Sequence, residues 1–167
     1  MKKQKEASEE TVARLMKRLR LTLSIAESCT GGLLCHKITN VSGSSKYFKG
    51  GIIAYHNEVK KQLLGVPAHI LSKFGAVSRE TAVAMAYSIR KIMAADIGIA
   101  ITGIAGPTGG TAAKPVGSVF IAISAATKSN CQNFLFQGNR KTIKLSTSNK
   151  ALNMLKEFLL AKDNGTK

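Results

Sequence analysis

A serine and a cysteine stand side by side at a glycine-rich turn of the sequence, in the heptapeptide from Ala26 to Gly32 (AESCTGG). An alternating apolar run, Leu21–Ala26, precedes this turn and an amphipathic run, Leu33–Ile38, follows it, which predicts a strand, a sharp turn and a helix. Ser28 or Cys29 would then stand at the carboxyl edge of a sheet, in front of unpaired N–H groups where the helix begins. This arrangement suits an anion or a developing oxyanion. In the alternative interpretation, the hydroxyl groups of the turn only cap the helix.

A basic side chain that would activate the serine occurs in the run Tyr55–Lys60 (YHNEVK). Asn57 is expected to cap a short helix over residues 58–64, so that Lys60 lies in its first turn. An ammonium group there faces the positive end of the helix dipole, and burial would lower its pKa further, so that it can act as a base near neutral pH. A serine needs such a base, and the hydroxyl of Tyr55 would relay the proton or hold the alignment. The alternative is a solvated lysine beside an aromatic residue at the sheet edge.

A second glycine-rich loop, Gly103–Gly110 (GIAGPTGG), follows the continuous apolar run Asp96–Thr102. Such a run is typical of a strand that is buried on both faces, and small residues let main-chain N–H groups approach a phosphate or an oxyanion. Neither loop matches a Walker sequence or a Gly-x-Gly-x-x-Gly fingerprint. Because ligands of open α/β sheets bind beyond the carboxyl ends of the strands, we expect both loops to face one crevice. The alternative is a long turn without a ligand.

Helical and strand patterns alternate along the chain, and the last two strands are joined by a turn at residues 128–130. This order predicts a three-layer α/β/α sandwich on a mixed, mostly parallel sheet. We expect one domain over residues 1–167, with frayed ends at 1–6 and 162–167. Expected strands span residues 22–26, 51–55, 96–102, 116–125 and 131–137, and expected helices span residues 30–39, 58–64, 68–74 and 140–160, with further helices opening at Ser8 and after Ser78.

The amino-acid composition argues against several classes of protein. The chain has 167 residues, a net charge of +16 and no tryptophan, so it would attract nucleic acid non-specifically but offers few aromatic rings for stacking bases. It has three cysteines without a Cys-x-x-Cys pair, and its three histidines have no metal-ligand spacing, so we expect neither a disulfide framework nor a metal site. No signal peptide or membrane-spanning run is apparent, and we expect a cytoplasmic protein.

Several long motifs occur in one order along the chain, and through them the sequence resembles the CinA carboxyl-terminal domain family, the stand-alone nicotinamide-nucleotide amidases. The resemblance covers about Leu21 to Leu160. Longer members carry an additional amino-terminal domain, which we do not expect in this sequence. The matching segments are AESCTGG at 26–32, SGSSKYFKGGIIAYHNEVK at 42–60, LLGV at 63–66, GAVS at 75–78, TGIAGPTGG at 102–110 and KPVG at 114–117.

The resemblance implies hydrolysis of the carboxamide of nicotinamide mononucleotide to nicotinic acid mononucleotide and ammonia, without a metal or cofactor. The family's nucleophile falls on Ser28, its tyrosine on Tyr55 and its lysine on Lys60. The neighbouring Lys61 would point about 100° around the helix, so Lys60 is preferred. The oxyanion is expected near Thr30 and Gly31. The remaining candidates for binding the substrate, above all its ribose phosphate, are Gly32, Thr102, Gly103, Ile104, Ala105, Gly106 and Arg140.

Three positions depart from the family pattern: Thr108 and Ala113 stand where acidic residues are common, and Asn139 stands where aspartate is frequent. None is a proposed catalytic residue, but they change the expected charge of the pocket. Two alternatives stay open. Cys29 is a rival nucleophile, and the chain could be a non-catalytic nucleotide- or nucleic-acid-binding module on the same fold. The expected partner is a small pyridine nucleotide, no membrane contact is expected, and a homodimer is left open beside a monomer.

Overall fold

The structure is a computed structural model that describes residues 7–165, and it is built on a five-stranded sheet in the order β2-β1-β3-β4-β5. β1 pairs in parallel with β2 and with β3, whereas β3 with β4 and β4 with β5 pair antiparallel. The predicted mixed sheet with a terminal hairpin is therefore confirmed. The strands are β1 (Leu23–Glu27), β2 (Phe48–Ile53), β3 (Ile97–Gly103), β4 (Ser118–Ala125) and β5 (Ser129–Leu135).

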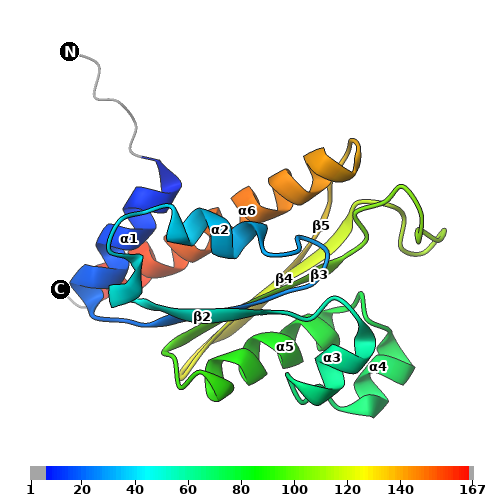
Figure 1. Ribbon diagram of the computed structural model, residues 1–167, viewed down its shortest axis with the longest axis horizontal. Helices are drawn as coiled ribbons and strands as arrows, with labels where there is room; N and C mark the ends of the chain where they lie inside the picture. Colours follow the sequence, from blue (N-terminus) through cyan, green and yellow to red (C-terminus); the bar gives the residue numbers. More distant parts are fainter. Residues whose placement is uncertain (1–6, 166–167) are drawn as a thin grey trace.

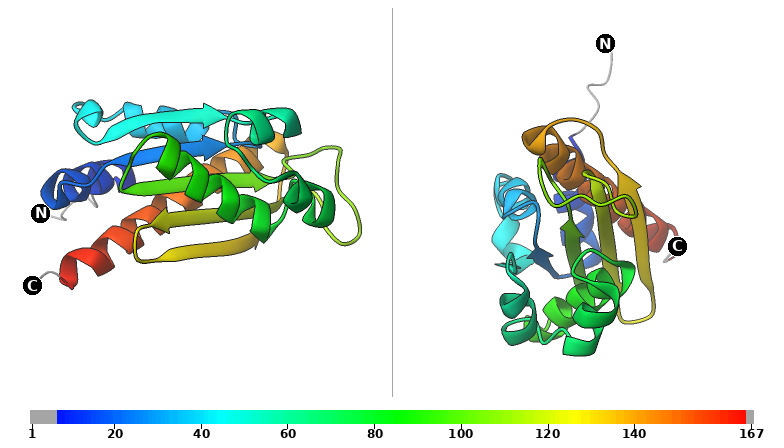
Figure 2. Two further views of the ribbon diagram at one scale, coloured as in Figure 1. Left: turned by 90° about the horizontal axis from the view of Figure 1, so that it is seen from below. Right: turned by 90° about the vertical axis from the view of Figure 1, so that its right-hand side faces the viewer.

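Helices cover both faces of the sheet, which confirms the predicted sandwich (Figure 1). One face carries α1 (Ser8–Leu19), α2 (Leu33–Thr39) and α6 (Arg140–Asn164). The other carries α3 (Asn57–Gln62), α4 (Ala68–Phe74) and α5 (Arg79–Ile92), and a 3₁₀ turn, η1 (Ser44–Lys46), precedes β2. The three parallel strands end on the same side of the molecule, where the loop from β3 to β4 projects (Figure 2).

Alternate residues of β3 pack into two separate apolar cores. Three isoleucines of this strand face α1, α2 and α6: Ile97, Ile99 and Ile101. Ala100 faces the opposite core, against α5. There α5 lies so close to the sheet that a Cβ atom added to Gly98 would come within 2.2 Å of the carbonyl oxygen of Ala86. Small residues on this face therefore let α5 pack directly onto the central strand.

The helix after the first turn begins later than the sequence predicts. α2 starts at Leu33 rather than at Thr30. The reason is that Gly31 and Gly32 have φ angles of 62° and 95°, which a right-handed helix does not contain. Residues 30–32 therefore form the turn itself.

The boundary of α3 also differs by one residue from the prediction. His56, not Asn57, is the N-cap, because its Nδ1 accepts a hydrogen bond from the N–H of Glu58 at 3.3 Å. Asn57 becomes the first helical residue, so Lys60 lies in the last turn of this short helix rather than in its first, and its N–H donates to the carbonyl oxygen of His56 at 3.2 Å.

At the carboxyl end of the chain, the hairpin turn and the last helix are both shifted. β5 begins at Ser129 rather than at Cys131. α6 continues to Asn164 rather than ending at Leu160, and residues 1–6 and 166–167, parts of the ends that are expected to fray, lie outside the described part of the chain.

Candidate active site

A buried lysine amine contacts the serine of the first turn. Nζ of Lys60 lies 3.2 Å from Oγ of Ser28. It also donates to the carbonyl oxygens of Ala54 at 2.8 Å and Tyr55 at 3.3 Å. A neutral amine has two N–H bonds and one lone pair. It can therefore donate to both carbonyls and still accept the proton of Ser28.

Local backbone bonds hold both members of this pair. Ser28 follows β1 directly, and its N–H donates to the carbonyl oxygen of Ile101 in β3 at 3.0 Å, which ties the turn to the central strand. Lys60 is in α3, and only 1% of its surface is exposed. The structure thus brings the two residues together from separate elements, 32 positions apart in the chain.

Burial lowers the pKa of the Lys60 amine, because a charged ammonium is poorly solvated in this position. Among the ion pairs found in residues 7–165 none involves Lys60, so no carboxylate there offsets the cost of charge. The direction agrees with the sequence argument, but the main cause is burial rather than the helix dipole. Lys61, the neighbouring candidate, instead pairs with Glu58 at 2.9 Å and is only half-buried.

Cys29 lies beside the serine but is a poor nucleophile. Burial raises the pKa of its thiol to about 12, and the Glu27 carboxylate adds to this shift. A thiolate is the reactive form, so the thiol of Cys29 is inert at neutral pH.

Glu27, which the sequence argument did not single out, holds the turn from behind. Its buried carboxylate accepts hydrogen bonds from the N–H groups of Gly32 at 3.0 Å, Leu34 at 3.2 Å and Cys35 at 2.8 Å. These are N–H groups at the start of α2, where carboxylates commonly cap helices. The sequence does contain a pattern that could have identified this role, namely an acidic residue directly before a turn that opens a helix.

This capping changes the expected role of the residues 30–32. The N–H of Gly32 is taken by Glu27, and the N–H of Gly31 donates to the carbonyl oxygen of Ser28 at 3.1 Å. Thr30 is fully buried, and its hydroxyl has no partner in the described chain. None of the three lines the cavity next to the serine, so the structure separates them from the other candidates.

That cavity, of about 310 Å³, lies beyond the carboxyl ends of β1 and β3 and gathers both glycine-rich loops. Ser28 and Lys60 line it together with the predicted Tyr55 and Arg140. Asn57, which the sequence argument treated only as a helix cap, also lines it, as does Thr108 of the second glycine-rich loop. The complete lining is Ser28, Cys29, Tyr55, Asn57, Lys60, Ala76, Val77, Thr102, Gly103, Ile104, Ala105, Gly106, Thr108, Gly109 and Arg140.

Tyr55 does not take the position expected of a proton relay. Its hydroxyl accepts a hydrogen bond from Nη2 of Arg140, and its ring is 56% exposed. In residues 7–165 no hydrogen bond joins this hydroxyl to Ser28 or Lys60; the lysine contacts only the backbone carbonyl of Tyr55. The structure therefore corrects the expectation of a hydroxyl between serine and lysine.

Arg140 opens α6 and reaches across the mouth of the cavity. Besides Tyr55, its guanidinium binds the carbonyl oxygen of Gly106 through Nη1 at 2.8 Å. Asn139 caps the same helix, since its Oδ1 accepts from the N–H of Thr142 at 3.0 Å. The guanidinium is thus fixed on the projecting loop, where it can meet an anion.

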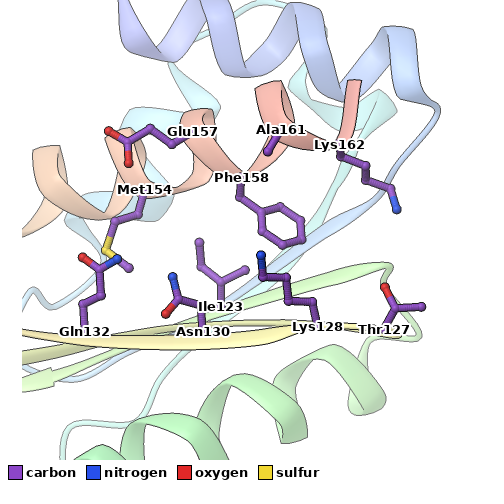
Figure 3. Close-up of a pocket in the computed structure, with 10 residues that line it drawn as sticks. All are labelled: Ile123, Thr127, Lys128, Asn130, Gln132, Met154, Glu157, Phe158, Ala161 and Lys162. Carbon is purple, nitrogen blue, oxygen red and sulfur yellow. The ribbon is translucent and has the colours of Figure 1, made fainter. Parts of the chain in front are cut away.

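A second cavity, of about 370 Å³, lies between α6 and the β4–β5 hairpin, near the opposite end of the strands (Figure 3). Apolar side chains such as Phe158 form its inner wall, and the amides of Asn130 and Gln132 point from β5 toward the helix. It contains no serine or cysteine, so it lacks a nucleophile for the chemistry considered above.

Residues 7–165 offer neither a metal-binding cluster nor a membrane-spanning helix. No group of three or more His, Cys, Asp or Glu side chains there is arranged to hold a metal ion. Within the same residues, no helix combines the length and the apolar character that crossing a membrane requires.

Comparisons with known proteins agree with this architecture. The family description of the CinA C-terminal domain matches residues 5–159. A protein from Desulforudis audaxviator, named for competence-damage induction, is 52% identical over 154 residues, which are 92% of this chain and 37% of that protein. A CinA-like protein from Geotalea daltonii is 49% identical over 157 residues, which are 94% of this chain and 38% of that protein.

Solved structures match over nearly their whole length. The competence or damage-inducible protein from Enterobacter asburiae superposes with a TM-score of 0.88 at 34% identity, covering 91% of this chain and 96% of that one. The competence/damage inducible protein CihA from Agrobacterium tumefaciens has a TM-score of 0.85 at 39% identity, covering 93% and 97%. By contrast, the chain spans less than two fifths of the length of the curated relatives.

Proposed function

The chain belongs to the CinA C-terminal domain family, and from this membership and the geometry of the site we propose that it is a hydrolase of a linear amide. The proposed substrate is nicotinamide mononucleotide, and the products are nicotinic acid mononucleotide and ammonia. The observation that carries the proposal is the contact of 3.2 Å between the Lys60 amine and the Ser28 hydroxyl, in a cavity and without a competing carboxylate partner in residues 7–165. A serine hydroxyl beside a buried amine is an activated nucleophile.

In the proposed reaction, neutral Lys60 takes the proton of Ser28 while Oγ attacks the carboxamide carbon. The tetrahedral intermediate then collapses, the C–N bond breaks, and the Lys60 ammonium returns its proton to the leaving ammonia. Water next attacks the acyl-enzyme with Lys60 again as base. The ester bond breaks, the acid is released, and the serine recovers its proton.

The negative charge that develops on the carbonyl oxygen calls for a backbone donor near the serine. The N–H of Cys29, directly after the nucleophile, bonds to no backbone carbonyl in residues 7–165, and Cys29 lines the cavity. We assign the oxyanion to this N–H instead of those of Thr30 and Gly31. A preorganised donor of this kind is worth about 10²–10³ in rate in other hydrolases.

We assign the phosphate of the substrate to the wall of the cavity opposite Ser28. Arg140 is fixed there, and the N–H groups of Ala105 and Gly106 bond to no backbone carbonyl in the described chain. A guanidinium beside free backbone N–H groups suits a phosphate. Phosphate at Arg140 and carboxamide at Ser28 would therefore orient the nucleotide across the cavity.

The net charge of +16 favours a second candidate, a nucleic-acid-binding module on the same fold. The two functions separate in one experiment: the purified chain is incubated with nicotinamide mononucleotide, and ammonia is measured. Release of ammonia that depends on Ser28 supports the amidase. Tight binding of DNA at physiological salt without ammonia release would establish the module instead.

A further inference from the structure

The cavity that holds Ser28 is lined by two basic side chains, Lys60 and Arg140, and by no carboxylate of the described residues. We propose that this pocket recognises the carboxamide and the phosphate of its ligand but not a positive charge on the ring between them. The substrate class would then be aromatic carboxamide ribotides in general, with charged and uncharged rings bound alike. This inference rests on the proposed amidase function, which it extends to the chemistry of the ring.

The two nearest glutamates in sequence are committed elsewhere. Glu27 sits behind the serine turn, and its carboxylate is occupied by three N–H groups of the start of α2. Glu58 is on α3, but it pairs with Lys61 at 2.9 Å and lines a different cavity, beside His56 and His69. Neither lines the reactive cavity, so a cationic ring gains no ion pair there.

Arg140 makes the mouth of the cavity favourable for an anion but not for a cation. Its guanidinium is always charged, and it is held by the carbonyl oxygen of Gly106 and the hydroxyl of Tyr55. It therefore cannot turn away from a cationic ring without losing two hydrogen bonds. A phosphate gains from this position, whereas a pyridinium ring gains nothing.

One group on the wall can still favour a cation. The ring of Tyr55 lines the cavity and is 56% exposed. A cation on an exposed aromatic face is favoured by a factor of only about two to five. This factor is the largest preference for the charged ring that the structure supports.

The test compares isosteric ligands on the Ser28→Ala variant, which binds without turnover. Calorimetry measures nicotinamide mononucleotide against benzamide riboside monophosphate, in which a carbon replaces the charged ring nitrogen. We expect dissociation constants within about fivefold of each other. Nicotinamide riboside, which keeps the cation but lacks the phosphate, should bind at least about tenfold more weakly because it has no anion for Arg140. A preference of more than tenfold for the charged mononucleotide would overturn the inference.

Thr108 offers a matched gain-of-charge control, because it is exposed and lines the cavity. Thr108→Asp adds a carboxylate to the wall of the cavity that receives the ring. It should raise the preference for the charged mononucleotide at least about threefold, since the carboxylate attracts the positive charge of the ring. Thr108→Asn has the same shape without the charge and should change nothing. An equal shift in both variants, or in neither, would contradict the argument.

The two proposals fail in different ways. If both mononucleotides bind equally but the unmodified chain releases no ammonia, the amidase function is wrong and the indifference to ring charge stands. If ammonia is released but only the charged mononucleotide binds, the amidase stands and the inference falls. Binding of neither ligand overturns both.

Discussion

The hydroxyl of Tyr55 accepts a hydrogen bond from the guanidinium of Arg140, a residue 85 positions further along the chain. Arg140 in turn binds the carbonyl oxygen of Gly106, so the end of β2, the β3–β4 loop and the start of α6 meet at one guanidinium. This bridge stands at the mouth of the cavity, whereas the serine–lysine pair stands at its base. The two groups of residues should therefore affect binding and chemistry separately.

The serine and its base should each be essential for turnover. We expect Ser28→Ala to remove activity and Lys60→Met to lower kcat by about 10²–10⁴, the usual contribution of a general base. Cys29→Ala is the matched control at the adjacent position and should keep activity within about tenfold, because its thiol is not ionised. Ammonia release is measured, with circular dichroism to verify folding. Full turnover by Ser28→Ala would exclude the mechanism.

Loss of the Tyr55 hydroxyl should act on KM more than on kcat. Tyr55→Phe frees one side of Arg140, so the phosphate is held less firmly, and we expect KM for nicotinamide mononucleotide to rise about three- to tenfold, as for the loss of one hydrogen bond of ordinary strength. Nicotinamide riboside lacks the phosphate and should be affected much less. Steady-state kinetics with both compounds measures the two effects. A drop in kcat for both compounds at unchanged KM would instead support the role of the Tyr55 hydroxyl as a proton relay.

Activity should fall as the pH is lowered through the depressed pKa of Lys60. Only the neutral amine accepts the serine proton, so kcat/KM rises with pH and levels off above that pKa. Thr108→Asp adds the first carboxylate to the lining of the cavity, and because a negative charge favours the ammonium form, it should raise the pKa of Lys60 and move the profile to higher pH. The Thr108→Asp variant tests this with a pH–rate profile, and an unmoved profile would place the titrating group elsewhere.

The same lysine should cost stability at neutral pH. Its folded-state pKa lies below that of the unfolded chain, so between the two values the unfolded chain binds more protons and stability rises with pH. Lys60→Met removes this penalty, and we expect a higher Tm at pH 7 and a weaker rise of Tm toward alkaline pH. Lys61→Met, at the half-buried neighbouring position, is the control and should leave both the Tm at pH 7 and its rise toward alkaline pH nearly unchanged. A lower Tm for Lys60→Met would mean that the amine stabilises the fold.

Replacing the Glu27 carboxylate should loosen the serine turn. Glu27→Gln keeps the shape but loses the charge that accepts three N–H groups, and we expect a loss of about 1–3 kcal/mol in the free energy of unfolding. Activity should drop as well, because Ser28 follows this residue directly. Urea denaturation measures the first effect and ammonia release the second. Unchanged stability would show that the carboxylate does not hold the turn.

The sequence by itself predicted five strands, although not all of their bounds, the serine turn and the helix that carries Lys60, because these depend on local periodicity and on glycine positions. Ser28 and Lys60 lie in one stretch of the chain, in which β1, α2, η1, β2 and α3 follow one another. The residue types and their spacing made both residues candidates beside a solvated-lysine alternative, and the resemblance to the CinA family selected them.

Only the tertiary structure decided what surrounds that pair. Burial of Lys60 and the meeting of Tyr55 with Arg140 depend on how separate segments pack, which no local pattern encodes. The capping role of Glu27 is a local contact, but the folded turn decides which N–H groups its carboxylate accepts. The glycines of the first turn illustrate the difference: their spacing predicted a turn, but it did not show that their N–H groups face a carboxylate and a carbonyl rather than the cavity. The direction of a backbone N–H is fixed by dihedral angles and neighbours in space, and these exist only in the folded chain.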